Sequence, residues 1–582
     1  MSQFVGYVQK NEANGPATGS HDFARVERVL REALAARSGC LQSVEIRNGP
    51  FWCAGVPVSS SGANLCVVRP EGLVGAVLGD PLMAEDADGA PAPAIHASVN
   101  EVVDALGSWQ TGALRRSQGS FSAVAWNPRS RTLTLATDKL GIRPLFYKEE
   151  PDRFVFASTL RLLRTACGQA QRVDERGFAE FLFLAQPLGA RTVLDGVWLL
   201  RPGEALRFDR SSTTERVRYF TLADVPRSTL PRNEALRELH AVFGRAVRRR
   251  LSSGEQEAFL SGGMDSRAVV AELVDQGQSV ATFSASYPGS PDDVVAEIVA
   301  EAFGTQHITW QRSPSEQVHL SGAPFSQYAA EHFRSPRQGN VSSIWSGDGG
   351  SVMLGHVYLD VARTALAGQP ITADLMRRLL PGIGGRRTRH LSPARLRQLG
   401  DLAVEGLVEE FRSYEAAPPD RRLFMYYASN DQARHLHQHF ESIETSKIDL
   451  LTPFFDAAFV SLVMSLPTAW FLRHAFYNDW IQGFRCRAGD LYWQSYPGHV
   501  PCPHTRPVGA GSDQWDPSWF QDSASRQRFR ALASRLAHSN YQLSRPFVRR
   551  TLLHAASWLS LAGSSRLNYE ISNAQRIVDA LD

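Results

Sequence analysis

A strand that runs through two glycines into a helix constrains this chain of 582 residues more than any other segment. The segment reads Ala258-Phe-Leu-Ser-Gly-Gly-Met-Asp-Ser-Arg-Ala-Val-Val270. Glycines let backbone amides approach an anion closely, and the start of the following helix adds unpaired amides and a positive dipole. The segment therefore predicts a phosphate-binding turn in an α/β sheet, the alternative being a plain glycine turn that contains Asp and Ser by chance.

The polar residues of this turn indicate which bond of a nucleotide would break. Ser261 and Ser266 supply hydroxyl donors. Gly262 and Gly263 supply amides, and Asp265 is suited to hold Mg²⁺ against phosphates. No lysine follows the glycines as it does in a Walker A loop. A turn without that lysine suits pyrophosphate as a leaving group, so we expect attack at the α-phosphate of ATP and an AMP intermediate.

Composition narrows the class of protein. Hydrophobic residues make up 43% of the chain and charged residues 21%, and the net charge is only +3. The six cysteines form no CxxC pair, the N-terminus lacks a signal-peptide pattern, and no apolar run is long enough to span a membrane. We expect a soluble cytoplasmic enzyme that has neither a nucleic acid nor a membrane as partner.

The hydrophobic pattern divides the chain into four parts. Residues 1–210 are β-rich with interspersed helices, which predicts an α+β layered domain. Residues 211–232 are predicted to be a linker, 233–500 a parallel α/β unit that becomes mostly helical, and 501–582 a mainly helical extension. The expected strands are 4–8, 65–68, 122–126, 133–136, 257–260, 280–284 and 307–310, and the expected helices are 23–36, 98–106, 233–251, 266–276 and 292–303.

Further segments match a known family. The N-terminal half contains Asp138-Lys-Leu-Gly-Ile-Arg-Pro-Leu-Phe-Tyr147, Phe156-Ala-Ser, and Thr192 through Arg201-Pro-Gly203. The C-terminal half adds Thr282-Phe-Ser284 with Asp292-Asp293, Gly304-Thr-Gln-His307, Ser346-Gly-Asp-Gly-Gly350 and Pro453-Phe-Phe-Asp456. Together with the phosphate turn, these segments resemble the asparagine synthetases that join an N-terminal nucleophile (Ntn) glutaminase domain to a PP-loop synthetase domain.

The resemblance implies a fold and a set of site residues. The fold is an α+β Ntn-hydrolase-like β-sandwich domain followed by an α/β PP-loop domain of the adenine nucleotide alpha hydrolase-like type, with a helical C-terminal part. Asp265 and Asp348 would bind Mg²⁺ and take part in catalysis. ATP and pyrophosphate would be bound by Leu260, Ser261, Gly262, Gly263, Asp265, Ser266, Phe283, Ser284, Ser346 and Gly347.

The glutaminase half departs from the family pattern. The family has Cys directly after the initiator Met, whereas this chain begins Met1-Ser2-Gln3-Phe4. The glutamine-binding R-G-P-D segment is missing, and Leu78-Gly-Asp-Pro81 stands where the family has N-G-E-I. A role for Ser2 as an N-terminal nucleophile is the alternative. We therefore expect that glutamine is not the nitrogen source.

The synthetase half departs at two positions. Ser351 stands where a second magnesium-binding aspartate is expected, and Val352 where a glutamate follows. The family's late lysine has no counterpart, since only Arg473 and His474 follow Leu466-Pro467. An arginine would replace the charge of that lysine but not its point-like geometry.

The sequence says least about which residues bind the amine that accepts the activated carboxylate. Relatives without the glutaminase cysteine include β-lactam synthetases and lasso-peptide macrolactam cyclases, which capture an amine already tethered to the substrate. The segment from Arg434 to Glu444 lies where the family builds its acceptor pocket, so Glu444 or Glu441 is the expected base. A polar helix face is the alternative for this segment, and zinc binding by His435 and His439 lacks a third ligand.

The leading hypothesis is an ATP-dependent, AMP-forming amide synthetase that acts on a carboxylate- and amine-bearing substrate. Its most concrete version is a macrolactam cyclase with a precursor peptide as substrate and a leader peptidase as partner. The alternatives are asparagine formation or amidation of a glycan or small molecule with ammonia, and a degenerate scaffold that binds nucleotide without turnover.

Overall fold

The computed structural model describes residues 3–10, 27–32, 44–56, 66–83, 95–168, 171–209, 214–286, 289–311, 342–380, 388–443, 448–511, 523–539, 542–561 and 568–581. Within these residues it confirms every expected strand and helix to within a few residues. Of the helix expected at 23–36, residues 27–32 are helical and the remainder lies outside the described residues.

The N-terminal domain is built from two antiparallel sheets of six strands each. The first sheet contains, in spatial order, β10 (Trp198–Leu199), β8 (Phe146–Glu149), β9 (Arg153–Ala157), β1 (Gln3–Gln9), β3 (Phe51–Val56) and β2 (Val44–Asn48). The second contains β12 (Thr214–Arg218), β11 (Glu204–Asp209), β7 (Thr132–Thr137), β6 (Phe121–Asn127), β5 (Val74–Gly79) and β4 (Cys66–Val68).

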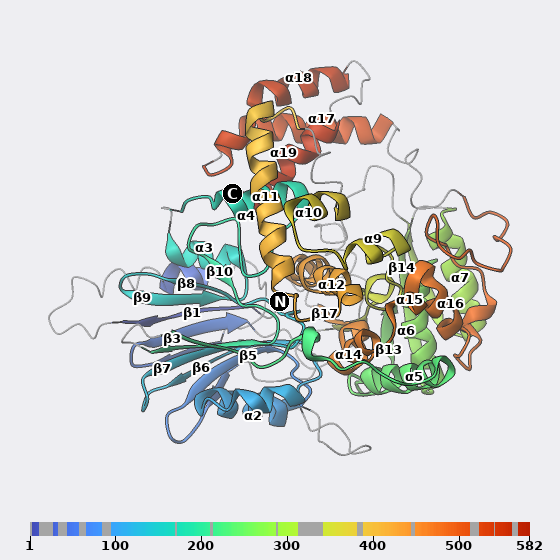
Figure 1. Cartoon of the computed structure of the whole chain (residues 1–582), viewed down its shortest axis with the longest axis horizontal. Coiled ribbons are helices and arrows are strands. Elements are labelled where there is room, and N and C mark those ends of the chain that lie inside the picture. Colours follow the sequence, from blue (N-terminus) through green and yellow to red (C-terminus); the bar gives the residue numbers. More distant parts are fainter. Residues whose placement is uncertain are drawn as a thin grey trace.

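Alternating side chains explain why the two sheets stack. On β1, Phe4 and Val8 face the inter-sheet core, whereas Val5 and Tyr7 pack on the opposite side against helices. Successive residues of a strand point to opposite faces, so a strand that is apolar on both faces must be covered on both. Helix α2 (Ile95–Gly107) covers the second sheet, and α3 (Leu160–Cys167) and α4 (Glu175–Leu184) cover the first, which gives four layers (Figure 1).

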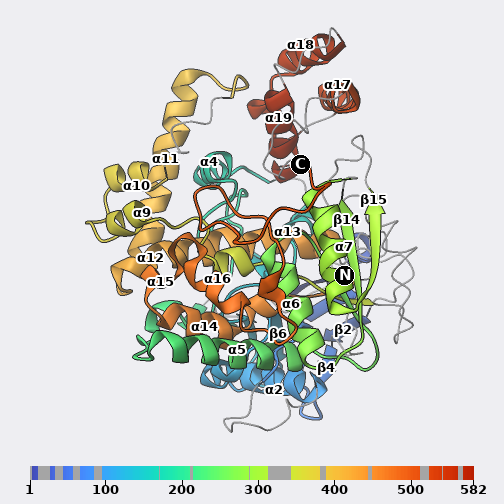
Figure 2. The same cartoon turned by 90° about the vertical axis from the view of Figure 1, so that its right-hand side faces the viewer.

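The C-terminal half contains a parallel sheet of five strands. Its spatial order is β15 (Gln306–Gln311), β14 (Val280–Ser286), β13 (Gln256–Phe259), β16 (Ser342–Trp345) and β17 (Ile448–Leu451). The chain moves outward from β13 through α6 (Met264–Asp275) to β14 and through α7 (Pro291–Phe303) to β15, with α7 beside these two strands (Figure 2). It then returns to β16 on the other side of β13, so the strand order reverses between β13 and β16. In open α/β sheets such a switch point is where ligands bind.

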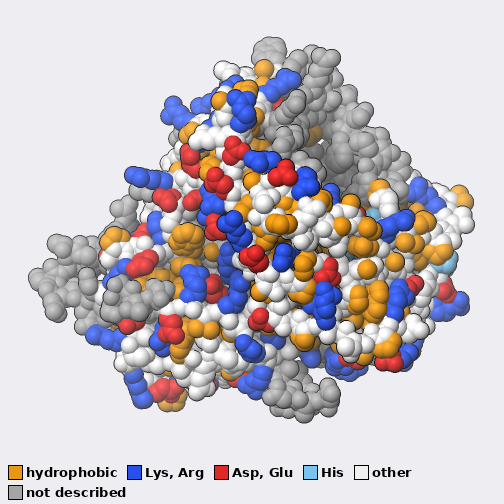
Figure 3. All heavy atoms as spheres, in the orientation of Figure 1, with side chains coloured by type: hydrophobic (Ala, Val, Ile, Leu, Met, Phe, Trp, Pro, Cys, Tyr) orange, Lys and Arg blue, Asp and Glu red, His pale blue; other side chains and the backbone are white. Residues whose placement is uncertain are grey.

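The described part of the C-terminal half contains further helices. In order they are α5 (Arg232–Arg248), α9 (Val361–Leu366), α10 (Ala373–Leu379), α11 (Pro393–Arg412), α12 (Pro419–Tyr426), α13 (Ala433–Ile443), α14 (Ala457–Ser465), α15 (Thr468–Phe471), α16 (Ala475–Ile481), α17 (Ser523–His538), α18 (Arg550–Leu561) and α19 (Asn568–Leu581). No helix among the described residues is long and apolar enough to cross a membrane. On the face drawn in Figure 3, acidic and basic side chains are interspersed, in keeping with the small net charge.

The segment predicted to be a linker, 211–232, is partly a strand. β12 pairs antiparallel with β11, so the second sheet extends to Arg218, past the predicted boundary at residue 210. Thr214-Glu-Arg-Val-Arg218 is an edge strand of mostly polar residues, and we misinterpreted this polar composition as that of a linker. Edge strands are commonly polar because they face water along one side.

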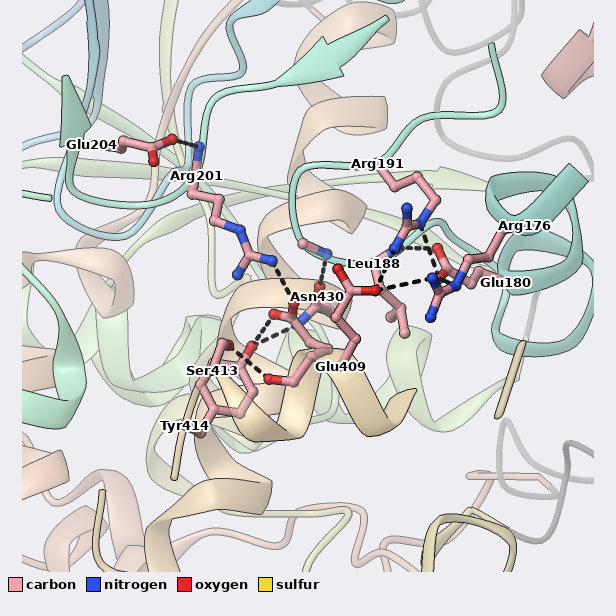
Figure 4. A network of polar contacts seen from close by, with 12 residues as sticks. Arg176, Glu180, Leu188, Arg191, Arg201, Glu204, Glu409, Ser413, Tyr414 and Asn430 are labelled. Carbon is pink, nitrogen blue, oxygen red and sulfur yellow. Dashed lines mark hydrogen bonds and ion pairs between the residues drawn. The ribbon is translucent and has the colours of Figure 1, made fainter. Parts of the chain in front are cut away.

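A buried polar network joins the two halves (Figure 4). Arg201, which precedes β11, donates to Glu410 of α11 at 2.9 Å, and Glu410 also accepts from Tyr414 and from Asn430, the latter at 3.1 Å. Burial raises the pKa of Glu410, but the charge of Arg201 and the hydrogen bonds outweigh burial and hold this pKa below its ordinary value. Glu410 is therefore an anion that joins the C-terminal half to the N-terminal domain.

Candidate active site

The two glycine-rich segments meet at the switch point of the parallel sheet. The turn of residues 261–263 follows β13, and the segment of residues 346–350 follows β16, the neighbour of β13. Carboxyl ends of adjacent parallel strands lie at one edge of a sheet. The structure thereby brings together the two glycine segments that the sequence placed in one site.

Hydrogen bonds between two serines fix the shape of the phosphate turn. The backbone amide of Ser261 donates to Oγ of Ser266 at 3.0 Å, and the two serine hydroxyls lie 3.0 Å apart. The amide of Gly263 donates to Oγ of Ser261 at 3.3 Å. Because Ser266 belongs to the first turn of α6, these contacts hold the turn over the helix N-terminus, where anions are stabilised.

Close packing explains why glycines occupy the second segment. A Cβ atom at Gly347 would lie 2.3 Å from the backbone nitrogen of Ser266, and one at Gly350 would lie 2.6 Å from Cγ of Asp265. Neither position has room for a side chain. The segment after β16 therefore lies directly against the first turn of α6.

Asp265 is held by two neutral residues. Its Oδ2 accepts from the amide of Ser351 at 2.9 Å and from the Ser351 hydroxyl at 2.7 Å, and its Oδ1 accepts from the Tyr477 hydroxyl at 2.8 Å. Burial raises the pKa of Asp265 to about 6, while the bonds from Ser351 and Tyr477 lower it and the charge of Asp348 raises it. Ser351, which replaces an expected aspartate, thus lies in contact with Asp265.

Asp348 is oriented by its own segment. Its Oδ2 accepts from the Ser346 hydroxyl at 2.8 Å, and its amide donates to the same Ser346 oxygen at 3.1 Å. The amide of Ser346 donates to the carbonyl of Leu451 at 2.9 Å, which fixes the segment to β17. The aspartates predicted to bind Mg²⁺ are therefore near each other and separately anchored.

A cavity of about 130 Å³ opens beside the turn. It is lined by Ser261, Gly263, Met264, Asp265, Asp292, Ser351, Gln494 and Tyr496. Two of these side chains are acidic and none is basic. The cavity therefore offers donors from the turn and acceptors from its walls, but it needs an added cation if it is to hold a polyphosphate.

These oxygen ligands fit Mg²⁺. Asp265 and Asp348 offer carboxylate oxygens, the hard ligands that Mg²⁺ prefers, and Mg²⁺ commonly takes only one or two carboxylates and completes its shell with phosphates and water. Asp265 has no Arg, Lys or His partner among the described residues. A buried carboxylate that lacks a cationic partner is the arrangement that an arriving cation would stabilise.

The strand next to the turn places the other predicted nucleotide residues. Leu260 is buried, and its amide donates to the carbonyl of Phe283 on β14 at 2.8 Å. Ser284, also on β14, lies 3.3 Å from Nε2 of His307 on β15, and Thr282 lies 2.9 Å from Nδ1 of the same ring. The predicted ATP residues thus occupy one edge of the sheet from β14 to β16.

The predicted acceptor segment is only partly described. Glu444 lies outside the described residues, and of Glu441 only the backbone, within α13, is described. His437 faces the N-terminal domain, because its Nε2 bonds to the carbonyl of Gly141 at 2.9 Å. Burial lowers the pKa of His437 to about 3, so this ring is neutral and serves as a domain contact. In the part of the chain that is described, no cluster of three His, Cys, Asp or Glu side chains is arranged to hold a metal ion.

The residues nearest the missing lysine do not replace it. Arg473 is exposed, and its Nε donates to the carbonyl of Gly498 at 3.1 Å. His474 is buried beside His499, and burial lowers its pKa to about 3, so it carries no charge near neutral pH. Lys447, the lysine of the C-terminal half, lies outside the described residues.

Leu78-Gly-Asp-Pro81, which stands where the family has N-G-E-I, lies at the end of β5 and packs closely against the residue before β6. Asp80 accepts from the amide of Leu82 at 3.2 Å, and burial raises the pKa of Asp80 to about 6. Gly79 has a φ of +83°, and a Cβ there would lie 2.3 Å from the carbonyl oxygen of Ser120. Ser2 lies outside the described residues, so its proposed role as a nucleophile stays a prediction.

The sequence did not predict Tyr496, which lines the cavity, or two residues that bond to aspartates of the site. Tyr477 is 212 positions from Asp265, and Gln494 is 202 positions from Asp292, to which its Nε2 donates at 3.1 Å. Neither residue stands in a recognisable pattern, so only the folded chain shows that they belong to the site.

Comparison with known proteins agrees with this geometry. Residues 96–220 match the family model of a glutamine amidotransferase domain, and residues 238–331 match that of asparagine synthase. The chain is similar to the asparagine synthetases. Glutamine-hydrolysing asparagine synthetase 3 of Bacillus subtilis is 28% identical over 235 residues, which are 37% of this chain and 38% of that protein.

Two further asparagine synthetases are similar to about a third of this chain. A putative glutamine-hydrolysing asparagine synthetase of Mycobacterium tuberculosis is 28% identical over 36% of this chain and 34% of its own length. The human glutamine-hydrolysing asparagine synthetase is 28% identical over 32% of this chain and 34% of its own. The chain thus spans about a third of the length of the curated relatives it matches.

A solved structure also aligns with part of this chain. It is glutamine phosphoribosylpyrophosphate amidotransferase of Bacillus subtilis with ADP and GMP, and the match covers 61% of this chain and 77% of that protein at 10% sequence identity. The TM-score of 0.25 is too low to indicate a common fold.

Proposed function

We propose that this protein is an ATP-dependent, AMP-forming amide synthetase that activates a carboxylate and transfers it to an amine. The observation that carries the proposal is the contact of the 261–266 turn with the 346–351 segment at the switch point of the sheet. The cavity beside that contact is lined by Ser261, Ser351 and the carboxylates of Asp265 and Asp292, among others. The similarity of residues 238–331 to asparagine synthase supports this chemistry.

The chain's own residues have defined roles in the proposed reaction. The amides of the turn, with the hydroxyls of Ser261 and Ser266, would retain the β- and γ-phosphates while the substrate carboxylate attacks the α-phosphate. Asp265 and Asp348 would hold Mg²⁺, which neutralises charge on the departing pyrophosphate when it is bound. The amine then attacks the acyl carbon, and AMP leaves.

We further propose that the amine is carried by the substrate itself, as in macrolactam formation on a precursor peptide processed by a leader peptidase. Ser2 in place of cysteine and Leu78-Gly-Asp-Pro81 in place of N-G-E-I support a nitrogen source other than glutamine. A tethered amine has a high effective concentration, so no second nitrogen source is needed. Glu441 and Glu444 are the proposed bases that deprotonate it.

A second candidate is a nucleotide-binding scaffold without turnover. Both oxygens of Asp265 already accept hydrogen bonds from Ser351 and Tyr477, and neither Arg473 nor His474 supplies a cation to the cavity. In such a scaffold the turn would bind ATP but no acid would be activated.

Exchange of labelled pyrophosphate into ATP distinguishes these candidates. The full chain is incubated with Mg²⁺, ATP and labelled pyrophosphate together with aspartate, glycan acids or carboxylate-bearing peptides. Exchange that requires a peptide with a free amine supports the cyclase, and exchange with aspartate supports asparagine formation. Absence of exchange, combined with measurable ATP binding, supports the scaffold and contradicts the proposed synthetase.

A further inference from the structure

A carboxylate of the chain lies on an amide of the phosphate turn. Asp292 is the second residue of α7, and its Oδ1 accepts from the backbone amide of Gly262 at 2.9 Å. Gly262 is the first glycine of the turn, where amides are expected to face the phosphates. One donor of the predicted anion site is therefore already bonded to an internal anion.

A second contact holds this carboxylate in place. Nε2 of Gln494 donates to the same Oδ1 of Asp292 at 3.1 Å, and the backbone amide of Gln494 donates to the carbonyl of Gly262 at 3.2 Å. The segment that carries Gln494 is anchored on α6, because the buried Arg267 donates to the carbonyls of Leu491 and Tyr492. Asp292, Gly262 and Gln494 thus form a closed ring of contacts beside the turn.

A phosphate and the Asp292 carboxylate would compete for the backbone amide of Gly262. A phosphate oxygen that approached the Gly262 amide would meet the charge of Asp292 at hydrogen-bonding distance from the same donor. Among the described residues, the cavity wall adds the carboxylate of Asp265 and no basic side chain. Like charges a few ångströms apart and shielded from water repel strongly. We expect this repulsion to lower the affinity of the turn for a phosphate several-fold or more.

We propose that Asp292 is a positioning residue that orients the Gly262 amide in the empty turn and then weakens the hold of the turn on pyrophosphate, which promotes release of this product. The inference rests on the proposed function, because it assumes that the turn binds the β- and γ-phosphates. It adds a regulator of product release to the residues that retain the phosphates.

The next residue in the chain offers a matched control. Asp293 is also a carboxylate in the first turn of α7, but it accepts from the amide of Gly289 at 2.8 Å and from the Ser286 hydroxyl at 3.2 Å. It does not line the cavity. D292N and D293N therefore make the same chemical change one position apart, and only D292N removes the charge beside the turn.

The test is calorimetric titration of the wild-type chain, D292N and D293N with magnesium pyrophosphate and, separately, with magnesium ATP. We expect D292N to bind pyrophosphate roughly tenfold more tightly, because the asparagine oxygen still accepts from Gly262 while the repulsion is removed. D293N should bind as the wild type does. D292S, which also lacks the charge, provides a second variant if D292N does not fold, and circular dichroism checks the fold of each.

The pH dependence separates charge from structure. Burial raises the pKa of Asp292, so lowering the pH toward this raised pKa neutralises Asp292 in the wild type and should shrink the advantage of D292N. The ratio of the two affinities cancels the titration of pyrophosphate itself and of Asp265 and Tyr496, the other titratable groups that line the cavity.

Each outcome decides between named possibilities. Tighter binding by D292N, with a ratio that falls at low pH, supports the inference. Equal or weaker binding by D292N, or a pH-independent ratio, overturns it while leaving the proposed function intact. Failure of the wild-type chain to bind either magnesium pyrophosphate or magnesium ATP contradicts the proposed function and the inference together.

Discussion

Single residues at the site determine the surroundings of Asp265. Ser351, which stands where the family pattern leads us to expect an aspartate, donates to Asp265 through both its amide and its hydroxyl. Together with Tyr477, it satisfies a carboxylate that would otherwise be buried with few partners. Asp265 is therefore surrounded by neutral hydrogen-bond donors.

Removing the Tyr477 hydroxyl tests whether Asp265 must be ionised. In Y477F the carboxylate loses a donor that favours its charged form, so its pKa rises above the present value of about 6. The acid limb of the pH–rate profile of pyrophosphate exchange should therefore move to higher pH. The loss of one hydrogen bond should also lower the free energy of unfolding by about 1 kcal/mol.

Y358F is the control for this prediction, since Tyr358 is 40% exposed and packs against Tyr427 with tilted rings, whereas the hydroxyls that donate to Asp265 come from Ser351 and Tyr477. Its pH–rate profile should match that of the wild type. An unchanged acid limb in Y477F would show that Asp265 does not govern the rate.

Among the elements, α11 carries two adjacent glutamates with different surroundings. Glu410 is 4% exposed and pairs with Arg201, whereas Glu409 is 57% exposed and pairs with Arg176 and Arg191 (Figure 4). Removal of one partner from a buried ion pair leaves an uncompensated charge, while exposed pairs contribute little. The helix therefore joins the two halves mainly through Glu410.

The variants E410Q and E409Q measure this difference. E410Q should lower the free energy of unfolding by about 3 kcal/mol, because Arg201 loses its anion and Tyr414 its acceptor charge. E409Q should lower it by less than about 1 kcal/mol. Urea denaturation followed by tryptophan fluorescence gives both values, and equal effects in the two variants would contradict the role assigned to Glu410.

The sequence predicted elements well where the pattern was local. The strand, glycine pair and helix at 257–276 follow from residues in direct succession, and the structure has β13, the turn and α6 there. The strand β12 was missed because an edge strand has a polar composition like that of a linker. The site was only half predicted, because Tyr477 and Gln494 reach it from more than 200 positions away and only tertiary packing brings them there.

In the whole molecule, the C-terminal segment from Phe547 to α19 packs against both the N-terminal domain and the C-terminal half. Phe547, just before α18, packs against Phe178 of α4 with ring centroids 4.0 Å apart. Glu570 of α19 accepts from the hydroxyl of Thr388 at 2.9 Å and from the amide of Arg389 at 3.0 Å. The same hydrophobic core runs from Val5 of β1 to Leu581 at the end of α19. The extension is therefore part of one cooperative structure.

Truncation of Phe547 tests this cooperativity. F547A should lower the free energy of unfolding by about 3 kcal/mol through the cavity it leaves against Phe178. V508A is the control, because Val508 is fully exposed and its removal should change stability by less than about 0.5 kcal/mol. Thermal unfolding should show one shifted transition for F547A, whereas a separate early transition would show that the extension unfolds independently.

The central claim is that ATP bound at the 261–266 turn is cleaved between its α- and β-phosphates. The most direct measurement is separation of the products formed from α-labelled ATP by the wild-type chain and by D265N, in the presence of the acid that supports pyrophosphate exchange. We expect labelled AMP from the wild type and at least about 100-fold less from D265N, since the variant loses a carboxylate of the catalytic site. Labelled ADP, or undiminished AMP from a folded D265N, would contradict the assignment of this turn.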